Sequence, residues 1–209
     1  MSDSEEQPTL FEINESHLDT GLRGVPVGTC KTSFVSSTKG VHYVGYPISD
    51  LADMSPEDII FLLFEKRLPN RQESQSFSKD LAARAEEMPA GALRILESMT
   101  PGSGHPMDWL SVGIQALGMA ETTGDVRADS LNLIARMPEL MASIFLLRGG
   151  HGLPKSGSEP SLGLVENFVH LLGVQGIEAE NMIRVLRTFL VLHMDHGGGN
   201  LSTFSGKCV

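Results

Sequence analysis

Apolar residues recur at spacings of three and four through most of this chain, which places side chains on one face of an α-helix. Ser55, Pro56 and Glu57 are a typical helix start, with a capping serine, a proline in the first turn and an acid beside it. We predict separate helices on either side of Met137 and Pro138, because proline disfavours helical backbone in the residue before it. The pattern predicts about eight helices, over about residues 55–68, 72–87, 90–99, 105–119, 126–136, 138–147, 162–172 and 178–196.

Two short runs near the N-terminus are rich in β-branched and aromatic residues, which indicates strands. The runs cover residues 30–35 and 41–46, and the glycine-containing segment 36–40 between them is typical of a hairpin loop. The predicted fold class is therefore all-α, multi-helical, with a small N-terminal β-hairpin. We also predict a polar N-terminal tail over residues 1–19 and a helical domain over residues 20–209.

The composition is that of a globular protein and argues against several classes of partner. The formal net charge is −10 and Lys and Arg do not cluster, so we expect neither nucleic acid nor a membrane surface as a partner. We find no apolar run of membrane-spanning length. Cys30 and Cys208 are too few for a disulfide framework, and the acidic N-terminus is neither a signal nor a transit peptide. We therefore expect a cytoplasmic location.

The last predicted helix leads into a glycine-rich stretch that is the best candidate for a binding site. Its apolar stripe comprises Met182, Leu186, Phe189 and Leu190. His193 continues this stripe, so we expect it to be buried, and His196 follows one turn later on the same side. Glycines 197–199 should end the helix there, because glycine tolerates the backbone of a C-cap. The helix dipole favours a protonated imidazole at this end, so His196 with Asn200 would suit a small dicarboxylate.

Residues 193–204, HMDHGGGNLSTF, resemble the His-x-Asp-His-x-Gly-Gly-Asn-x-Ser segment of citrate synthases. Gly197 stands where the longer version of that segment usually has Glu. Other similarities follow in family order over about residues 20–209. They are Gly-Leu-Arg-Gly-Val at 21–25, His-Pro-Met at 105–107, Leu-Ile-Ala-Arg-Met-Pro at 133–138 and Glu-Asn-Phe at 166–168. By this resemblance the chain is identified as a member of the citrate synthase family, and it matches the larger, helical domain of that family.

The resemblance implies a homodimeric transferase of the tricarboxylic acid cycle that condenses acetyl-CoA with oxaloacetate to give citrate and CoA. It implies that His196 holds oxaloacetate, that Asn200 lines the site and that His193 is a supporting residue. It also implies acid–base and electrostatic catalysis with no metal and no cofactor, acetyl-CoA being a substrate. The family's catalytic His, catalytic Asp and substrate-binding arginines belong to elements that we do not find before Val209. We therefore expect no catalytic residue in these 209 residues and no activity from them alone.

Three alternatives remain open from the sequence. A 2-methylcitrate synthase, which uses propionyl-CoA, fits nearly as well, because acyl selection lies outside this stretch. A non-catalytic helical scaffold, or a subunit of a split enzyme, would keep the fold without the full catalytic set. A metalloprotein would need His193, Asp195 and His196 as ligands, but Asp195 points away from the face that the two histidines share. His105 begins a predicted helix, and we expect it to have a capping or packing role there and not to act as a base.

Overall fold

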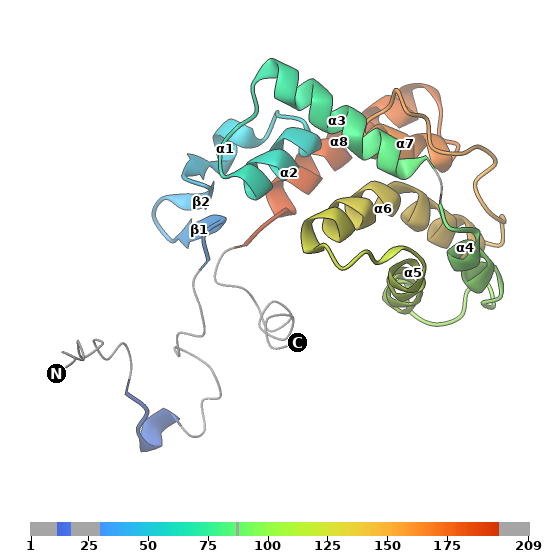
Figure 1. Ribbon diagram of the computed structural model, residues 1–209, viewed down its shortest axis with the longest axis horizontal. Helices are drawn as coiled ribbons and strands as arrows, with labels where there is room; N and C mark the ends of the chain where they lie inside the picture. Colours follow the sequence, from blue (N-terminus) through green and yellow to red (C-terminus); the bar gives the residue numbers. More distant parts are fainter. Residues whose placement is uncertain (1–11, 18–29, 87, 197–209) are drawn as a thin grey trace.

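The computed structural model describes residues 12–17, 30–86 and 88–196, and the last two of these ranges form a helical domain with a small sheet at one end (Figure 1). The helices are α1 (Ile48–Leu51), α2 (Pro56–Glu65), α3 (Arg71–Ala85), α4 (Ala90–Glu97), α5 (Pro106–Glu121), α6 (Val126–Arg148), α7 (Leu164–Leu171) and α8 (Gly176–His193), with a 3₁₀ helix at Glu15–His17. The predicted fold class, all-α with a small N-terminal β element, is confirmed. The predicted boundary between residues 19 and 20 lies outside the described residues.

Side chains that precede the helices fix several of their starts. Ser55 Oγ accepts a hydrogen bond from the backbone N–H of Asp58 at 3.1 Å, as its place before a proline predicts. Before α3, the side chains of Asn70 and Glu73 each accept a hydrogen bond from the other residue's backbone in a capping box. α2 ends earlier than predicted, because Lys66 takes a left-handed conformation with a φ of 61° and its N–H closes the last turn.

The sheet is antiparallel and has the order β1–β2–β3. The strands β1 (Ser33–Ser36) and β2 (Gly40–Tyr43) form the predicted hairpin. The third strand, β3 (Tyr46–Pro47), is not predicted, because two residues are too few to show an alternating pattern. Val44 and Gly45 connect β2 to β3 with φ values of 49° and 88°. Positive φ at both positions is what a two-residue hairpin turn of this kind requires.

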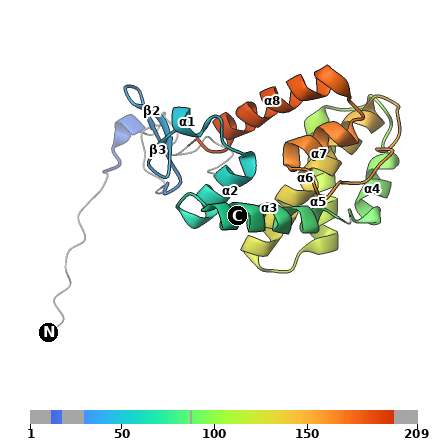
Figure 2. The same cartoon turned by 90° about the horizontal axis from the view of Figure 1, so that it is seen from above.

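Helix α6 is the centre of the helical domain and packs against α3, α4, α5 and α7 (Figures 1 and 2). The prediction of two helices around Pro138 is wrong, because Val126–Arg148 is one continuous helix with Pro138 inside it. Pro138 is buried and lines a small space together with Ala82 and Ala85 of α3. This packing stabilises a helix that lacks one backbone hydrogen bond at the proline.

The continuity of α6 also changes what its composition permits. By length and composition alone, it is the one helix among the described residues that could cross a membrane. A helix break at Pro138, as the sequence predicts it, would divide this run into two segments that are each too short to cross a membrane. Of the 18-residue segment of α6 with the highest mean hydropathy, 50% is buried inside the domain. A helix that packs in a protein core has such burial.

Three clusters of buried apolar side chains hold the elements together. The first lies between α4, α5 and α6 and contains Trp109 and Leu140. The second lies between α2, α3 and α6. The third joins the sheet, α1, α2 and the last turn of α8, and contains Tyr43 and Val191. This third cluster connects the N-terminal sheet to the helix that leads into the candidate site.

Two glycines of α5 allow a matched test of the first cluster. A Cβ at Gly113 would lie 2.6 Å from Cδ1 of Leu140, which is fully buried and has little room to move. A Cβ at exposed Gly118 would meet only Thr122 Oγ1, at 3.8 Å. Overpacking a core costs about 1–3 kcal/mol, whereas replacing a helical glycine by alanine gains about 0.5–1 kcal/mol.

We therefore expect Gly113→Ala to lower the free energy of unfolding and Gly118→Ala to raise it. Urea denaturation followed by circular dichroism measures both variants under the same conditions. Equal midpoints for the two variants would show that the contact between α5 and α6 is looser than described.

Candidate functional site

The candidate site lies beyond the C-terminal end of α8, which runs from α7 to the sheet (Figure 2). The helix begins at Gly176, whose φ of 64° suits glycine, and its predicted start near residue 178 is close to this. Val191 is its only buried residue. Phe189 and Leu190 of the predicted stripe are 53% and 40% exposed. The stripe therefore does not pack into a closed core within the described residues.

That stripe instead borders a large apolar groove between α2, α6, α7 and α8. The groove has a volume of about 700 Å³ and is lined almost entirely by carbon. Its lining includes Phe64, Met141, Phe145, Phe168, Leu186 and Leu190. A surface without polar partners cannot hold a dicarboxylate, because the charged groups would lose water without compensation. The groove therefore does not suit oxaloacetate, and the candidate for holding it stays the segment after α8.

His193 is exposed, so the prediction that it is buried is wrong. Its Nδ1 lies 2.7 Å from the carbonyl oxygen of Phe189, and its ring stacks on the Phe189 ring with centroids 4.1 Å apart. The spacing of the stripe identifies a common face but not whether other elements cover that face. In the structure, the third cluster covers Val191, which lies on another side of the helix.

The chain leaves the helix at His193, three residues before the predicted end. The backbone N–H of Asp195 donates to the hydroxyl of Tyr43 at 3.3 Å instead of continuing the helical ladder. The next N–H, of His196, donates to Oδ1 of Asp195 at 2.7 Å. His196 itself is exposed, as predicted, whereas Asn200 lies outside the described residues. Of the three predicted binding residues, the structure thus places His193 and His196 at the surface, and it leaves Asn200 untested.

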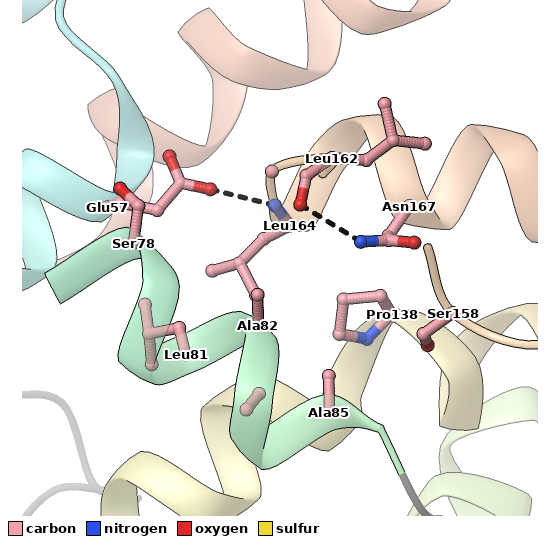
Figure 3. Close-up of a pocket in the computed structure, with 12 residues that line it drawn as sticks. Glu57, Ser78, Leu81, Ala82, Ala85, Pro138, Ser158, Leu162, Leu164 and Asn167 are labelled. Carbon is pink, nitrogen blue, oxygen red and sulfur yellow. Dashed lines mark hydrogen bonds between the residues drawn. The ribbon is translucent and has the colours of Figure 1, made fainter. Parts of the chain in front are cut away.

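A second polar cluster joins α2 to α7, and Figure 3 shows it around a small pocket. Oε1 of Glu57 accepts a hydrogen bond from the N–H of Leu164 at 2.7 Å, at the N-terminal end of α7. Asn167 accepts from the N–H of Glu159 at 2.7 Å and donates to the carbonyls of Glu159 and Leu162. The pocket has a volume of about 10 Å³, which holds one water at most. This cluster is a structural joint and not a ligand site.

Sequence reasoning missed the parts that Glu57 and Asn167 play in this joint. The sequence pattern indicates only an acid in the first turn of α2 at Glu57, whereas in the structure this residue is only 5% exposed. Its partner is 107 positions away, so no local pattern could identify the contact. Asn167 belongs to the Glu-Asn-Phe similarity, but that similarity does not reveal which backbone groups the amide binds.

Two further predictions concern the helix cap at His105 and the alternative of a metal site. His105 caps α5, because its Nδ1 accepts the N–H of Met107 at 3.2 Å, while Asp108 accepts the N–H of His105. The predicted capping role of His105 is confirmed. Among the described residues, no group of three His, Cys, Asp or Glu side chains is placed to hold a metal ion.

Comparison with known proteins agrees with this architecture. A family model described as "Citrate synthase, C-terminal domain" matches residues 21–209. Citrate synthase 4, mitochondrial, of Arabidopsis thaliana is 28% identical over 90% of this chain and 44% of that protein. The 2-methylcitrate synthase, mitochondrial, of Fusarium solani is 27% identical over 96% of this chain and 48% of that protein.

The fold is also similar to that of a solved structure. The crystal structure of citrate synthase from Thermotoga maritima MSB8 matches with a TM-score of 0.73 and 25% identity, over 88% of this chain and 48% of that chain. This chain therefore spans about half the length of the relatives that it matches. Because the family match covers most of the sequence and the fold agrees with a solved member, the chain belongs to the citrate synthase family.

Proposed function

We propose that this chain holds oxaloacetate in a citrate synthase reaction, in which acetyl-CoA and oxaloacetate condense to give citrate and CoA. The family match supports this proposal, because it extends through the segment 193–204 in which the resemblance places the oxaloacetate-holding residues. The observation that carries it is the exposed position of His196 directly after α8, with its backbone N–H held by Asp195. An imidazole N–H there would donate to a carboxylate of the substrate, and Asn200 would donate an amide N–H.

We further propose that the group that removes a proton from the acetyl methyl is not part of this chain. Two histidines that the sequence singles out are already engaged within the fold, because His105 accepts an N–H in a helix cap and Nδ1 of His193 contacts a backbone carbonyl. A general base must instead be within reach of the proton that it removes. The family's other catalytic groups would then come from the half of the relatives that this chain does not match.

Propionyl-CoA is the second candidate acyl donor. Relatives named 2-methylcitrate synthase match over as much of this chain, and at nearly the same identity, as relatives named citrate synthase. Rates measured with acetyl-CoA and propionyl-CoA at equal concentration, in a complete enzyme containing this chain, would separate the two activities.

Titration of the full chain with oxaloacetate, followed by the NMR signals of its imidazoles, tests the binding role. We expect weak binding, with a dissociation constant of about 1 mM, which corresponds to about 4 kcal/mol. His196→Ala should weaken it by about ten- to a hundredfold, because a lost hydrogen bond to a charged group costs about 1.5–3 kcal/mol. We expect Asn200→Ala to weaken it less.

His193→Ala is the comparison variant, because the resemblance gives His193 only a supporting role and its ring is engaged within its own helix. This variant should weaken binding clearly less than His196→Ala. Equal losses of affinity in His193→Ala and His196→Ala would refute the assignment of oxaloacetate to His196. Absence of any oxaloacetate-dependent shift would refute the proposed binding role altogether.

We also propose that the chain self-associates, as the resemblance to a homodimeric family implies. The apolar groove and the exposed side chains of α8, such as Val185 at 62%, support association with further protein. Sedimentation at micromolar concentration should show a species larger than the monomer. A compact monomer that binds no dye specific for apolar surfaces would contradict this.

A cytoplasmic location stays a prediction, because the similar proteins are named as mitochondrial.

A further inference from the structure

Tyr43 is the residue that connects the N-terminal sheet to the candidate site. It ends β2, where its backbone pairs with Ser33 of β1 and with Tyr46 of β3. The next residue, Val44, donates its N–H to the carbonyl of Thr32 at 2.8 Å. The backbone on either side of Tyr43 is therefore fixed by strand pairing and by the tight turn that follows.

The side chain of Tyr43 is held as firmly as its backbone. It is fully buried in the third cluster, with Leu51 of α1, Ile59 and Leu62 of α2, and Val191 of α8. Burial raises the pKa of its phenol, so the hydroxyl stays neutral at physiological pH. A neutral hydroxyl retains its proton and can also accept a hydrogen bond from an N–H.

The hydroxyl of Tyr43 accepts the N–H of Asp195 at 3.3 Å, across 152 positions of sequence. In a longer helix this N–H would bond to the carbonyl four residues earlier, that of Val191. The contact with Tyr43 therefore accompanies the end of α8 at His193. Oδ1 of Asp195 in turn accepts the N–H of His196 at 2.7 Å. The backbone N–H groups of Asp195 and His196 are therefore both held by hydrogen bonds.

We propose that Tyr43 is a positioning residue for His196, acting through its hydroxyl on the backbone of Asp195. The phenol sets where the chain leaves α8 and thereby where the His196 imidazole is presented to substrate. The consequence for substrate binding rests on the proposed role of His196, whereas the effect on the backbone does not. Tyr43 makes no contact with substrate in this proposal.

Tyr43→Phe tests the proposal, because it removes the hydroxyl and keeps the buried ring. Tyr46→Phe is the matched control: Tyr46 is the other tyrosine of the chain, lies on the neighbouring strand and is 37% exposed. We expect amide hydrogen exchange at Asp195 to accelerate about three- to tenfold in Tyr43→Phe, as loss of one ordinary hydrogen bond predicts. The ring signals of His196 should shift in the same variant, and the dissociation constant for oxaloacetate should rise by a similar factor. Tyr46→Phe should change none of these.

The possible outcomes separate this proposal from the proposed function. Unchanged Asp195 exchange and unchanged His196 signals in Tyr43→Phe would overturn the proposal. Faster exchange with unaltered oxaloacetate affinity would reduce Tyr43 to a structural role and would also overturn it. If the unmodified chain binds no oxaloacetate, the proposed function fails, and the exchange rate and the His196 signals still decide whether Tyr43 positions this segment.

Discussion

Trp109→Ala is expected to lower the free energy of unfolding by about 3–5 kcal/mol, the usual cost of removing a large buried aromatic side chain. Trp109 is fully buried in the cluster between α4, α5 and α6. Its Nε1 donates to the carbonyl of Ser103 at 2.8 Å, and the guanidinium of Arg148 lies 5.7 Å from the ring centroid. Arg148 also donates to the carbonyls of Ser103 and Gly104, so the indole and the guanidinium together fix the loop before α5.

Urea denaturation followed by circular dichroism measures this effect, since the variant loses the only tryptophan of the chain. Trp109→Phe is the control, because it refills much of the space but cannot donate to Ser103. We expect its stability to lie between those of the unmodified protein and Trp109→Ala. A loss below about 1 kcal/mol in Trp109→Ala, typical of a surface substitution, would contradict the described packing of α5.

Glu57→Ala is the second change with a large expected effect, a loss of about 3 kcal/mol in the free energy of unfolding. Most of this loss comes from the hydrogen bond to the N–H of Leu164, since hydrogen bonds to a charged group are worth about 1.5–3 kcal/mol. The cavity left by the removed side chain adds to it, because Glu57 is buried against Gly163. The joint between α2 and α7 should loosen as a result.

Glu57→Gln is the matched variant, because its amide oxygen can still accept the N–H of Leu164. Thermal denaturation of both variants should rank Glu57→Gln clearly above Glu57→Ala. Amide exchange in the first turn of α7 should accelerate more in Glu57→Ala. If both variants melted together with the unmodified protein, the contact in Figure 3 would have no energetic importance.

Most of the helices and the hairpin could be predicted from the sequence, because local signals specify them. Ser55 with Pro56, and His105 with Pro106, begin helices in the structure as the sequence predicts. Pro138 shows where local signals fail. The clash of its ring with the preceding turn is a local effect, whereas the burial against α3 that offsets it depends on residues more than fifty positions away.

The candidate site was predictable only in part, for a related reason. A spacing of three and four identifies residues on one face of α8, but it does not say which face other elements cover. The structure therefore buries Val191 and exposes His193, against the prediction. The contact of Tyr43 with Asp195 that accompanies the end of the helix spans 152 positions and leaves no local pattern. His196 is exposed, as predicted, although α8 ends three residues earlier than the sequence indicates.

The most direct measurement is release of free CoA when the purified 209-residue chain is mixed with acetyl-CoA and oxaloacetate. We expect no release above the blank, because the chain is proposed to hold oxaloacetate without supplying the group that deprotonates the acetyl methyl. Enzymes that lose one member of a catalytic set commonly retain only a small residue of activity. Release that begins only after a second polypeptide with the remaining half of the fold is added would agree with this account. Turnover above about 1 per second by the chain alone, an ordinary enzyme rate, would contradict it.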